Sequence, residues 1–294
     1  MSFITYFING ISLGSIYALI ALGYTMVYGI AKMLNFAHGD VIMVGAFVVY
    51  TLCSTLGLHP VVGVLIAVIF CTLLGITIEK IAYKPLRKAS SPLAVLITAI
   101  GVSYLLQNSA LLIFGANTKS FTSVIPMEPI KLANGQLNIS GETVITIIVS
   151  IIIMIILMFF INKTKMGQAM LAVSEDKGAA QLMGINVNAT IALTFAIGSA
   201  LAAIAGVLLC SAYPSLTPYT GSMPGIKAFV AAVFGGIGSI PGAFIGGILL
   251  GIIEIFGKAY ISSQLADAIV FAVLIIVLLV KPTGLIGKNI QEKV

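Results

Sequence analysis

The sequence predicts an all-α protein, a polytopic bundle of transmembrane helices in which some helices are discontinuous or re-entrant. Hydrophobic residues make up 60% of the chain and charged residues only 8%, whereas soluble domains carry about 25% charged residues. Uncharged runs of about 20 residues recur, which is the length that a helix needs to cross the hydrocarbon core. The run at 144–160 reads VITIIVSIIIMIILMFF, continuously apolar rather than alternating, so a barrel strand is excluded.

Apolar segments follow one another along the chain, and we interpret residues 1–294 as a single transmembrane domain. They lie near residues 8–31, 41–57, 61–79, 92–115, 143–162, 189–212, 226–237, 240–256 and 265–281. The first has no basic region before it, so we expect a permanent helix rather than a cleaved signal peptide. The seventh is too short to cross comfortably. We therefore expect eight or nine spans and favour nine, some of them broken.

Basic residues beside the apolar segments predict the orientation. They cluster after the third, fifth and last segments, at Lys80, Lys84, Arg87 and Lys88, at Lys163, Lys165 and Lys177, and at Lys281, Lys288 and Lys293. The positive-inside rule places all three clusters in the cytoplasm. The connection at 116–142 has no basic excess and is expected outside, as is the amino terminus. This distribution also explains the net charge of +6 without a nucleic-acid-binding patch.

Two stretches place glycines and polar groups between apolar helices, at 32–47 and 221–247. Such interruptions are typical of the discontinuous helices that line transporter pathways. In the second stretch, the run GGIGSIPG should break a helix. Our candidates for the translocation pathway come from both stretches, namely Asn35, Phe36, His38, Gly39, Asp40, Gly225, Gly235, Gly236 and Gly238.

Several polar residues in these segments admit a purely structural interpretation. Asp40 is expected more often to cap a helix beginning at Val41 than to bind substrate directly. His38 is expected more often to hydrogen-bond a neighbouring helix than to relay protons. Glu254 and Lys258 are four residues apart and are expected to form a neutralising pair on one helix face. Close helix packing is expected at Gly242, Gly246 and Gly247. The three dispersed cysteines have no metal or redox spacing, so no metal site is predicted.

The cytoplasmic connection at about 163–188 contains a predicted short helix from Glu175 to Met183, with Gly184 as its stop. Its apolar residues Ala179, Leu182 and Met183 could face a partner protein, while Glu175, Asp176 and Lys177 stay in solvent. From the residues alone, an ordinary helix lying on the lipid surface is an equal alternative.

The chain resembles the LivH-type permease subunits of branched-chain amino acid ABC transporters. The matching runs are NGISLGSIYALIALGYTMVYGIAKMLNFAHGD, YKPLRKASSPLAVLITAIGVSYLLQN, AVSEDKGAAQLMGINV and GGIGSIPGAFIGG, in the family's order. The resemblance implies a subunit of an ATP-driven importer of branched-chain, hydrophobic amino acids in the inner (plasma) membrane of a bacterium. It also implies the partners: a second homologous permease, two cytoplasmic ATPases and an extracytoplasmic substrate-binding protein.

In related importers the cytoplasmic loop contains Glu-Ala-Ala, followed by Gly after three more residues, and it docks onto the ATPase. The corresponding run here has glycine in place of the glutamate, so an ionic contact with the ATPase would come from Glu175 or Asp176. The resemblance thus assigns the coupling loop to Glu175, Asp176, Ala179, Ala180 and Gly184.

The chain has no GxxxxGK[ST] phosphate loop, so it is not expected to be an enzyme. We expect it to bind no cofactor, with ATP held on the partner subunits. Two alternatives remain open: a permease for urea or a short amide, and a self-contained, ion-coupled secondary transporter, which His38, Asp40 and Glu254 would permit.

Overall fold

The computed structural model describes residues 2–88, 92–125, 127–132 and 137–287, and its architecture is helical as predicted. Each of the nine apolar segments forms a helix: α1 Ser2–Ala31, α2 His38–Val49, α3 Pro60–Ile78, α4 Pro92–Phe114, α5 Gly141–Lys163, α8 Val187–Ala212, α9 Ser222–Gly235, α10 Ile240–Tyr260 and α11 Ala266–Val280. Single π-helical segments extend α2 (Tyr50–Thr55) and α3 (Glu79–Tyr83), and a 3-10 turn, η3, follows at Pro85–Lys88.

Two short helices and four short strands complete the fold. The helices are α6 (Lys165–Glu175) and α7 (Lys177–Leu182). Strands β2 (Ile130–Leu132) and β3 (Leu137–Ile139) form an antiparallel pair. Strand β1 (Lys119–Ser120) pairs with β4 (Ser215–Leu216), also antiparallel, so the chain after α4 is joined to the chain after α8.

Seven helices of the described residues are long and apolar enough to cross a membrane. The other two, α9 with 14 residues and α11 with 15, reach only about 21–23 Å at 1.5 Å per residue, against about 30 Å of hydrocarbon. The seventh segment is therefore short, as expected. The segment predicted at 265–281 forms α11, which is likewise shorter than a full span.

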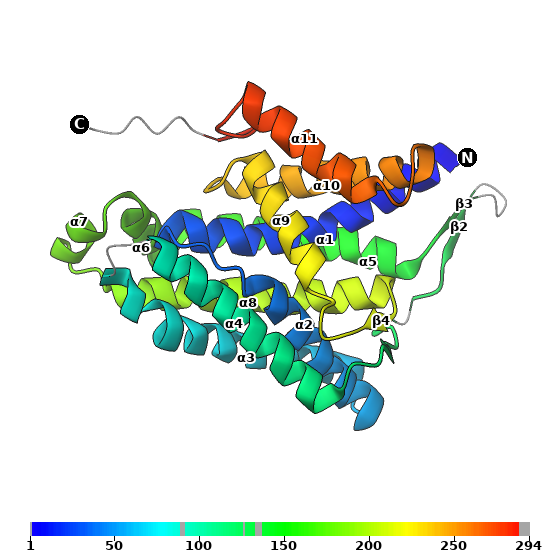
Figure 1. Ribbon diagram of the computed structural model, residues 1–294, viewed down its shortest axis with the longest axis horizontal. Coiled ribbons are helices and arrows are strands. Elements are labelled where there is room, and N and C mark those ends of the chain that lie inside the picture. Colours follow the sequence, from blue (N-terminus) through cyan, green and yellow to red (C-terminus); the bar gives the residue numbers. More distant parts are fainter. Residues whose placement is uncertain (1, 89–91, 126, 133–136, 288–294) are drawn as a thin grey trace.

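The helices run back and forth along the long axis of the molecule (Figure 1). The amino terminus and the β2–β3 hairpin lie at one end, whereas α6 and α7 lie at the other. The basic clusters after α3 and α5 lie near each other, since Lys177 bonds the end of α1 and Arg87 bonds the first turn of α8. Lys288 and Lys293 lie outside the described residues.

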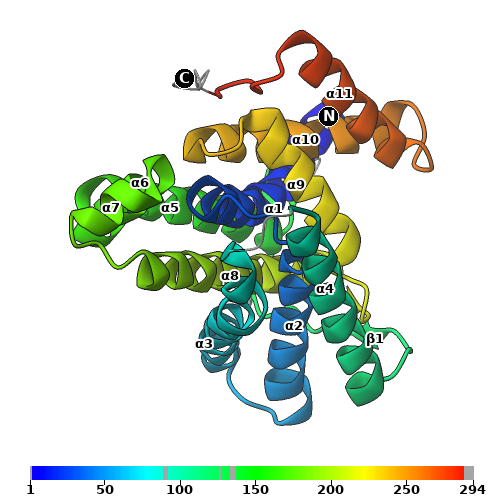
Figure 2. The same cartoon turned by 60° about the vertical axis from the view of Figure 1, so that its left-hand side comes forward.

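Helix α1 forms the core of the bundle, and Figure 2 shows it surrounded by α5, α8, α9 and α10. Small residues bring α1 and α10 together, since a Cβ at Gly247 would meet the backbone of Ala18 and one at Gly251 the backbone of Gly14. The predicted close packing is confirmed at Gly242 and Gly246 as well, where the neighbours are the carbonyls of Gly235 and Ala231 on α9. Without a hydrophobic force between helices in lipid, such close approach supplies the packing.

Candidate functional site

The first predicted interruption separates α1 from α2. Lys32 adopts a φ of 56°, which non-glycine residues seldom adopt, and the chain then runs back alongside α1. The ring of His38, at the start of α2, packs on Tyr24 at 4.6 Å and against Gly23. Gly23 lies eight residues before the end of α1, or about 12 Å. Helix α2 therefore begins about two turns inside the end of α1, as a discontinuous helix does.

The second interruption separates α9 from α10. Gly236 and Gly238 have φ values of 109° and 93°, which glycine adopts without strain. Ser239 caps α10, with its hydroxyl accepting a hydrogen bond from the amide of Gly242 at 3.2 Å, and Pro241 lies in the first turn. Both features end and restart a helix locally, so the prediction of a break at GGIGSIPG is confirmed.

The chain after α11 covers this second break, which the sequence analysis missed. The amides of Leu285 and Ile286 donate to the carbonyls of Phe234 and Gly235 at 2.9 and 3.0 Å. These carbonyls end α9 and need partners, because lipid provides none. Residues 282–287 are thus part of the bundle.

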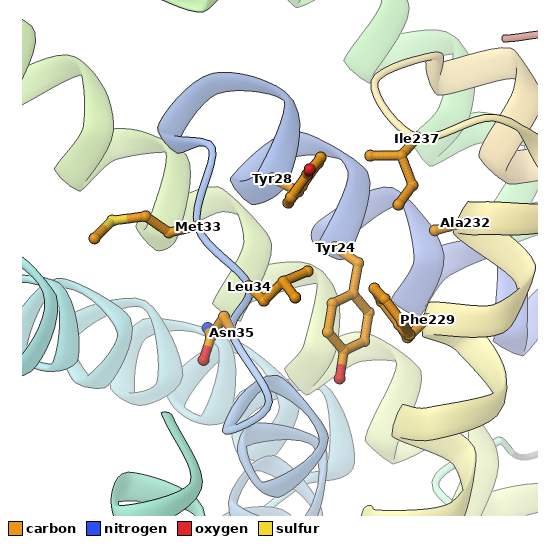
Figure 3. A pocket seen from close by; sticks show the side chains of 8 residues that line it. All are labelled: Tyr24, Tyr28, Met33, Leu34, Asn35, Phe229, Ala232 and Ile237. Atoms are coloured by element: carbon orange, nitrogen blue, oxygen red, sulfur yellow. The ribbon is translucent and has the colours of Figure 1, made fainter. Parts of the chain in front are cut away.

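The two interruptions meet at one small hollow (Figure 3). The residues that line it come from α1, the 32–37 loop, α9 and the second break: Tyr24, Tyr28, Met33, Leu34, Asn35, Phe229, Ala232 and Ile237. The side chains of Tyr24 and Phe229 lie next to each other in the view, with Asn35 on the opposite loop. The hollow has room for about one water molecule, so the helices are closed around it.

Glycines let the two interrupted segments touch beside the hollow. A Cβ at Gly39 would lie 2.8 Å from the carbonyl oxygen of Gly221, and one at Gly225 would lie 2.8 Å from the Cα of Gly39. Helices α2 and α9 therefore cross at backbone contact, although these residues are more than 180 positions apart. Gly39 and Gly225, pathway candidates from the two separate stretches, are therefore in contact in the fold.

The remaining pathway candidates differ in their position. Phe36 packs on Phe229 with ring centroids 5.9 Å apart. Asn35 lines the hollow, and its side-chain oxygen accepts from the hydroxyl of Tyr83 at 2.9 Å, which connects the first break to the end of α3. Residues Gly235, Gly236 and Gly238 shape the second break and are not among the lining residues.

The expectation that Asp40 caps a helix is wrong. Helix α2 begins at His38, three residues before the Val41 start that a cap at Asp40 would require, and its N-cap residue Ala37 offers no side-chain bond. Asp40 instead accepts a hydrogen bond from Gln107 Nε2 of α4 at 2.8 Å. The same nitrogen lies 3.3 Å from Ser103 Oγ and 3.3 Å from Ser222 Oγ. Gln107 and Ser222 were missed, although a glutamine inside an apolar helix is itself a signal.

His38 is buried, and its ring lies against α1. The expected hydrogen bond to a neighbouring helix is formed with the backbone of Ile20 on α1, whereas Nε2 has no hydrogen-bond partner among the described residues. A role in proton relay stays a prediction.

The predicted pair of Glu254 and Lys258 is confirmed, with an N–O distance of 2.6 Å, and it belongs to a larger network. Lys227 of α9 lies 2.8 Å from Glu254 and 2.6 Å from Asp267 of α11. The hydroxyl of Tyr17 donates to Glu254 at 2.8 Å. The network joins α1 and α10 to both short helices, and pairing lowers the cost of charges in the membrane. Lys227, Asp267 and Tyr17 were missed because no local spacing links them to Glu254.

The connection at 163–188 forms two helices rather than the single predicted one. The chain breaks at Asp176, whose carboxylate caps α7 by accepting from the amides of Gly178 and Ala179 at 2.7 and 3.0 Å, a role that aspartate favours. Gly184 ends the region with a φ of 82°, as predicted. Ala180 is buried, whereas Glu175, Asp176 and Ala179 are exposed.

The outer surface of α7 is apolar, since the side chains of Leu182 and Met183 are 91% and 82% exposed. Lys177 is exposed, as expected, and its ammonium also donates to the carbonyl of Ala31 at the end of α1, at 3.0 Å. Partial burial and the nearby charges of Arg87 and Lys32 lower the pKa of Lys177 below its usual value. Helix α7 is therefore tied to the residue that precedes the first break.

A second connection at this end involves Arg87, on η3. Its guanidinium pairs with Glu79 and donates to the side-chain oxygen of Asn188, near the start of α8, at 2.7 Å. The turn after α3 is thereby fixed to the first turn of α8. In the described residues, no three His, Cys, Asp or Glu side chains are grouped so that they could hold a metal ion.

Comparisons with known proteins agree along nearly the whole chain. A family model described as the permease component of branched-chain amino acid transport systems matches residues 6–278. The high-affinity branched-chain amino acid transport system permease protein LivH of Salmonella typhimurium is 45% identical over 99% of this chain and 98% of its own length. BraD of Pseudomonas aeruginosa, with the same description, is 44% identical over 98% and 96%. A probable LivH of Methanocaldococcus jannaschii is 30% identical over 92% and 88%.

Proposed function

Because the chain belongs to the family of permease components of branched-chain amino acid transport systems, we propose that it is the membrane-spanning subunit of an ATP-driven importer of branched-chain amino acids. The relatives LivH and BraD are described as high-affinity permeases for such amino acids. The subunit moves these hydrophobic substrates into the cytoplasm through the inner (plasma) membrane of a bacterium.

The meeting of the two interrupted segments at one hollow is the observation that carries this proposal. The hollow is lined mainly by aromatic and aliphatic side chains, with Asn35 as its polar member. A leucine, isoleucine or valine side chain matches such a lining, because apolar surface is attracted to apolar surface. Since the hollow is closed, passage requires α9 to move against α1 and α2. Interrupted helices are where transporters accommodate such movements.

The energy reaches this chain through contact in the proposed mechanism, since the sequence offers no phosphate-binding loop of its own. Two cytoplasmic ATPases contact the exposed side chains of Leu182 and Met183, and the exposed Glu175 forms an ionic contact with them. The bond from Lys177 to Ala31 then transmits a displacement of α7 to the end of α1. The coupling requires that the ATPases contact α7 differently in their open and closed states.

A second homologous permease and an extracytoplasmic binding protein complete the proposed assembly. The binding protein delivers the amino acid at the end that carries the amino terminus and the β2–β3 hairpin (Figure 1). ATP stays on the ATPases, and this chain binds no cofactor.

Uptake of labelled leucine into proteoliposomes tests the proposal. The vesicles contain this chain, its partner permease and the ATPases, with binding protein outside and ATP either inside or omitted. We expect uptake to require ATP and every partner. Excess isoleucine should suppress this uptake, whereas excess urea should not. Uptake by this chain alone under an ion gradient, indifferent to ATP, would overturn the importer assignment. Suppression of leucine uptake by urea would instead indicate a permease for urea or a short amide.

A further inference from the structure

We propose that Asp40, Ser103 and Ser222 form the site that holds the ammonium group of the amino acid during its passage. This inference rests on the proposed function and adds to it a substrate contact. The site is adjacent to the hollow described above, and it lies where α2, α4 and α9 come together.

Asp40 is a buried carboxylate without a cation. Its residue is 2% exposed, and it belongs to the first turn of a membrane-spanning helix. The other buried carboxylates of the described residues, Glu79 and Glu254, each form an ion pair, whereas Asp40 forms none with the described residues. A carboxylate inside a membrane is costly unless paired. A cationic group that visits the site would therefore be favoured over an apolar one.

The geometry around Gln107 shows the number of acceptors that the site offers. Its Nε2 lies 2.8 Å from Asp40 Oδ1, 3.3 Å from Ser103 Oγ and 3.3 Å from Ser222 Oγ. Three oxygens on three helices thus converge on one nitrogen. A primary ammonium has three N–H donors, so it can use all three oxygens, and its hydrogen bond to the carboxylate is charge-assisted. The amide of Gln107 occupies this position when no substrate is present.

The site is continuous with the apolar hollow through Tyr24. The ring of Tyr24 lines the hollow, while its hydroxyl would lie 3.5 Å from a Cβ at Gly225, which in turn contacts Gly39, the residue before Asp40. In Figure 3 this hydroxyl points away from Tyr28 and Ile237. An amino acid can therefore place its ammonium near Asp40 and its side chain in the hollow. The face of the tyrosine ring also suits a cation.

Helix α9 contributes to both halves of the combined site. Ser222 and Phe229 are seven residues apart on α9, so they lie on the same face, two turns from each other. A displacement of α9 would open the hollow and separate one oxygen from the ammonium site in the same movement. Gln107 and Ser222 are partly exposed, so the ammonium site can be reached from one side without unfolding of a helix.

The test is the variant Asp40→Asn in the reconstituted complex, because asparagine still accepts a hydrogen bond from Gln107 but carries no charge. We expect leucine uptake per ATP hydrolysed to fall at least tenfold, while hydrolysis stimulated by the binding protein stays within twofold of wild type. Asp267→Asn is the matched control, since it removes a carboxylate elsewhere in the bundle and leaves Lys227 paired with Glu254. We expect this control to transport within twofold of wild type.

Photo-leucine, a leucine analogue with a photoreactive side chain, provides a second readout. Irradiation during turnover should label peptides that contain Tyr24 or Phe229 in the wild type, with labelling reduced at least fivefold in Asp40→Asn. If that variant does not assemble, Ser222→Ala removes a single oxygen and should lower uptake per ATP about threefold.

Unchanged uptake and labelling in an assembled Asp40→Asn, or an unchanged ratio in Ser222→Ala, would overturn the ammonium site. The proposed function would stand in that case, because the wild type would still show ATP-driven uptake. A wild-type complex that takes up no leucine with ATP would overturn the proposed function itself.

Discussion

Removing the charge of Glu254 should destabilise the bundle far more than removing that of Asp267. Glu254 is 1% exposed and is the shared partner of Lys227, Lys258 and Tyr17. The change Glu254→Gln keeps the size of the side chain but leaves both lysines without this carboxylate. Lys258 is 39% exposed and can reach water. The Lys227 side chain is only 7% exposed, and in this variant Asp267 is its one remaining ion-pair partner among the described residues.

The magnitude follows from the cost of breaking a buried ion pair, which is about 3–5 kcal/mol. Because Asp267 still neutralises part of the charge on Lys227, we expect the lower limit, about 3 kcal/mol, for Glu254→Gln. The double variant Lys227→Met, Glu254→Gln removes both members of the buried pair. It should lower the free energy of unfolding by no more than about 3 kcal/mol, well below the sum of the effects of the two single changes. The Asp267 side chain is 47% exposed, so Asp267→Asn should cost less than about 1 kcal/mol.

Equilibrium unfolding in mixed micelles, followed by circular dichroism while the fraction of denaturing detergent is raised, measures these differences. The reasoning predicts a coupling free energy of at least about 1 kcal/mol between Lys227 and Glu254. Additive effects of the two single changes, or equal effects of Glu254→Gln and Asp267→Asn, would refute it.

Three further predictions concern helix packing and coupling. Gly247→Leu should separate α1 from α10 and prevent stable folding, measured as loss of monodisperse protein in detergent, whereas Gly101→Ala, where a Cβ meets no atom within 4 Å, should have no effect. Lys177→Met should lower leucine uptake several-fold while the ATPases remain bound, because the link to α1 is lost; uptake equal to wild type in a vesicle assay would contradict this link. Leu182→Asp should weaken co-purification of the ATPases at least tenfold, since it places a charge on the exposed apolar surface of α7, whereas the neighbouring Gln181→Asp should retain them; equal retention would exclude this surface.

Local sequence features were sufficient to predict the helices and their interruptions. Runs of apolar residues predicted all nine apolar helices, and the glycines and proline of GGIGSIPG predicted the break between α9 and α10. The stop at Gly184 follows from the same local chemistry. The division of α6 from α7 was missed, although Asp176 is a favourable cap residue and was available as a signal.

The partners of the polar residues could not be predicted, because they depend on which helices pack together. Asp40 finds Gln107 at a separation of 67 residues, and Glu254 finds Lys227 at a separation of 27. Neither contact can be predicted from the spacing of residues in the sequence. The covering of the α9 break by Leu285 has the same origin, since a backbone amide leaves no trace in the sequence. The contact of the two interruptions, which defines the candidate site, therefore became visible only in the fold.

Fixing the hollow in its closed state tests the central claim most directly. Leu34 and Ile237 line it from the first and the second break. In a background without Cys53, Cys71 and Cys210, cysteines at these two positions are joined by a short bifunctional maleimide, with each single cysteine variant as the control. The account predicts that the cross-link abolishes ATP-driven leucine uptake, whereas the treated single variants remain active. Undiminished uptake after complete cross-linking would show that the substrate passes elsewhere and would contradict the account.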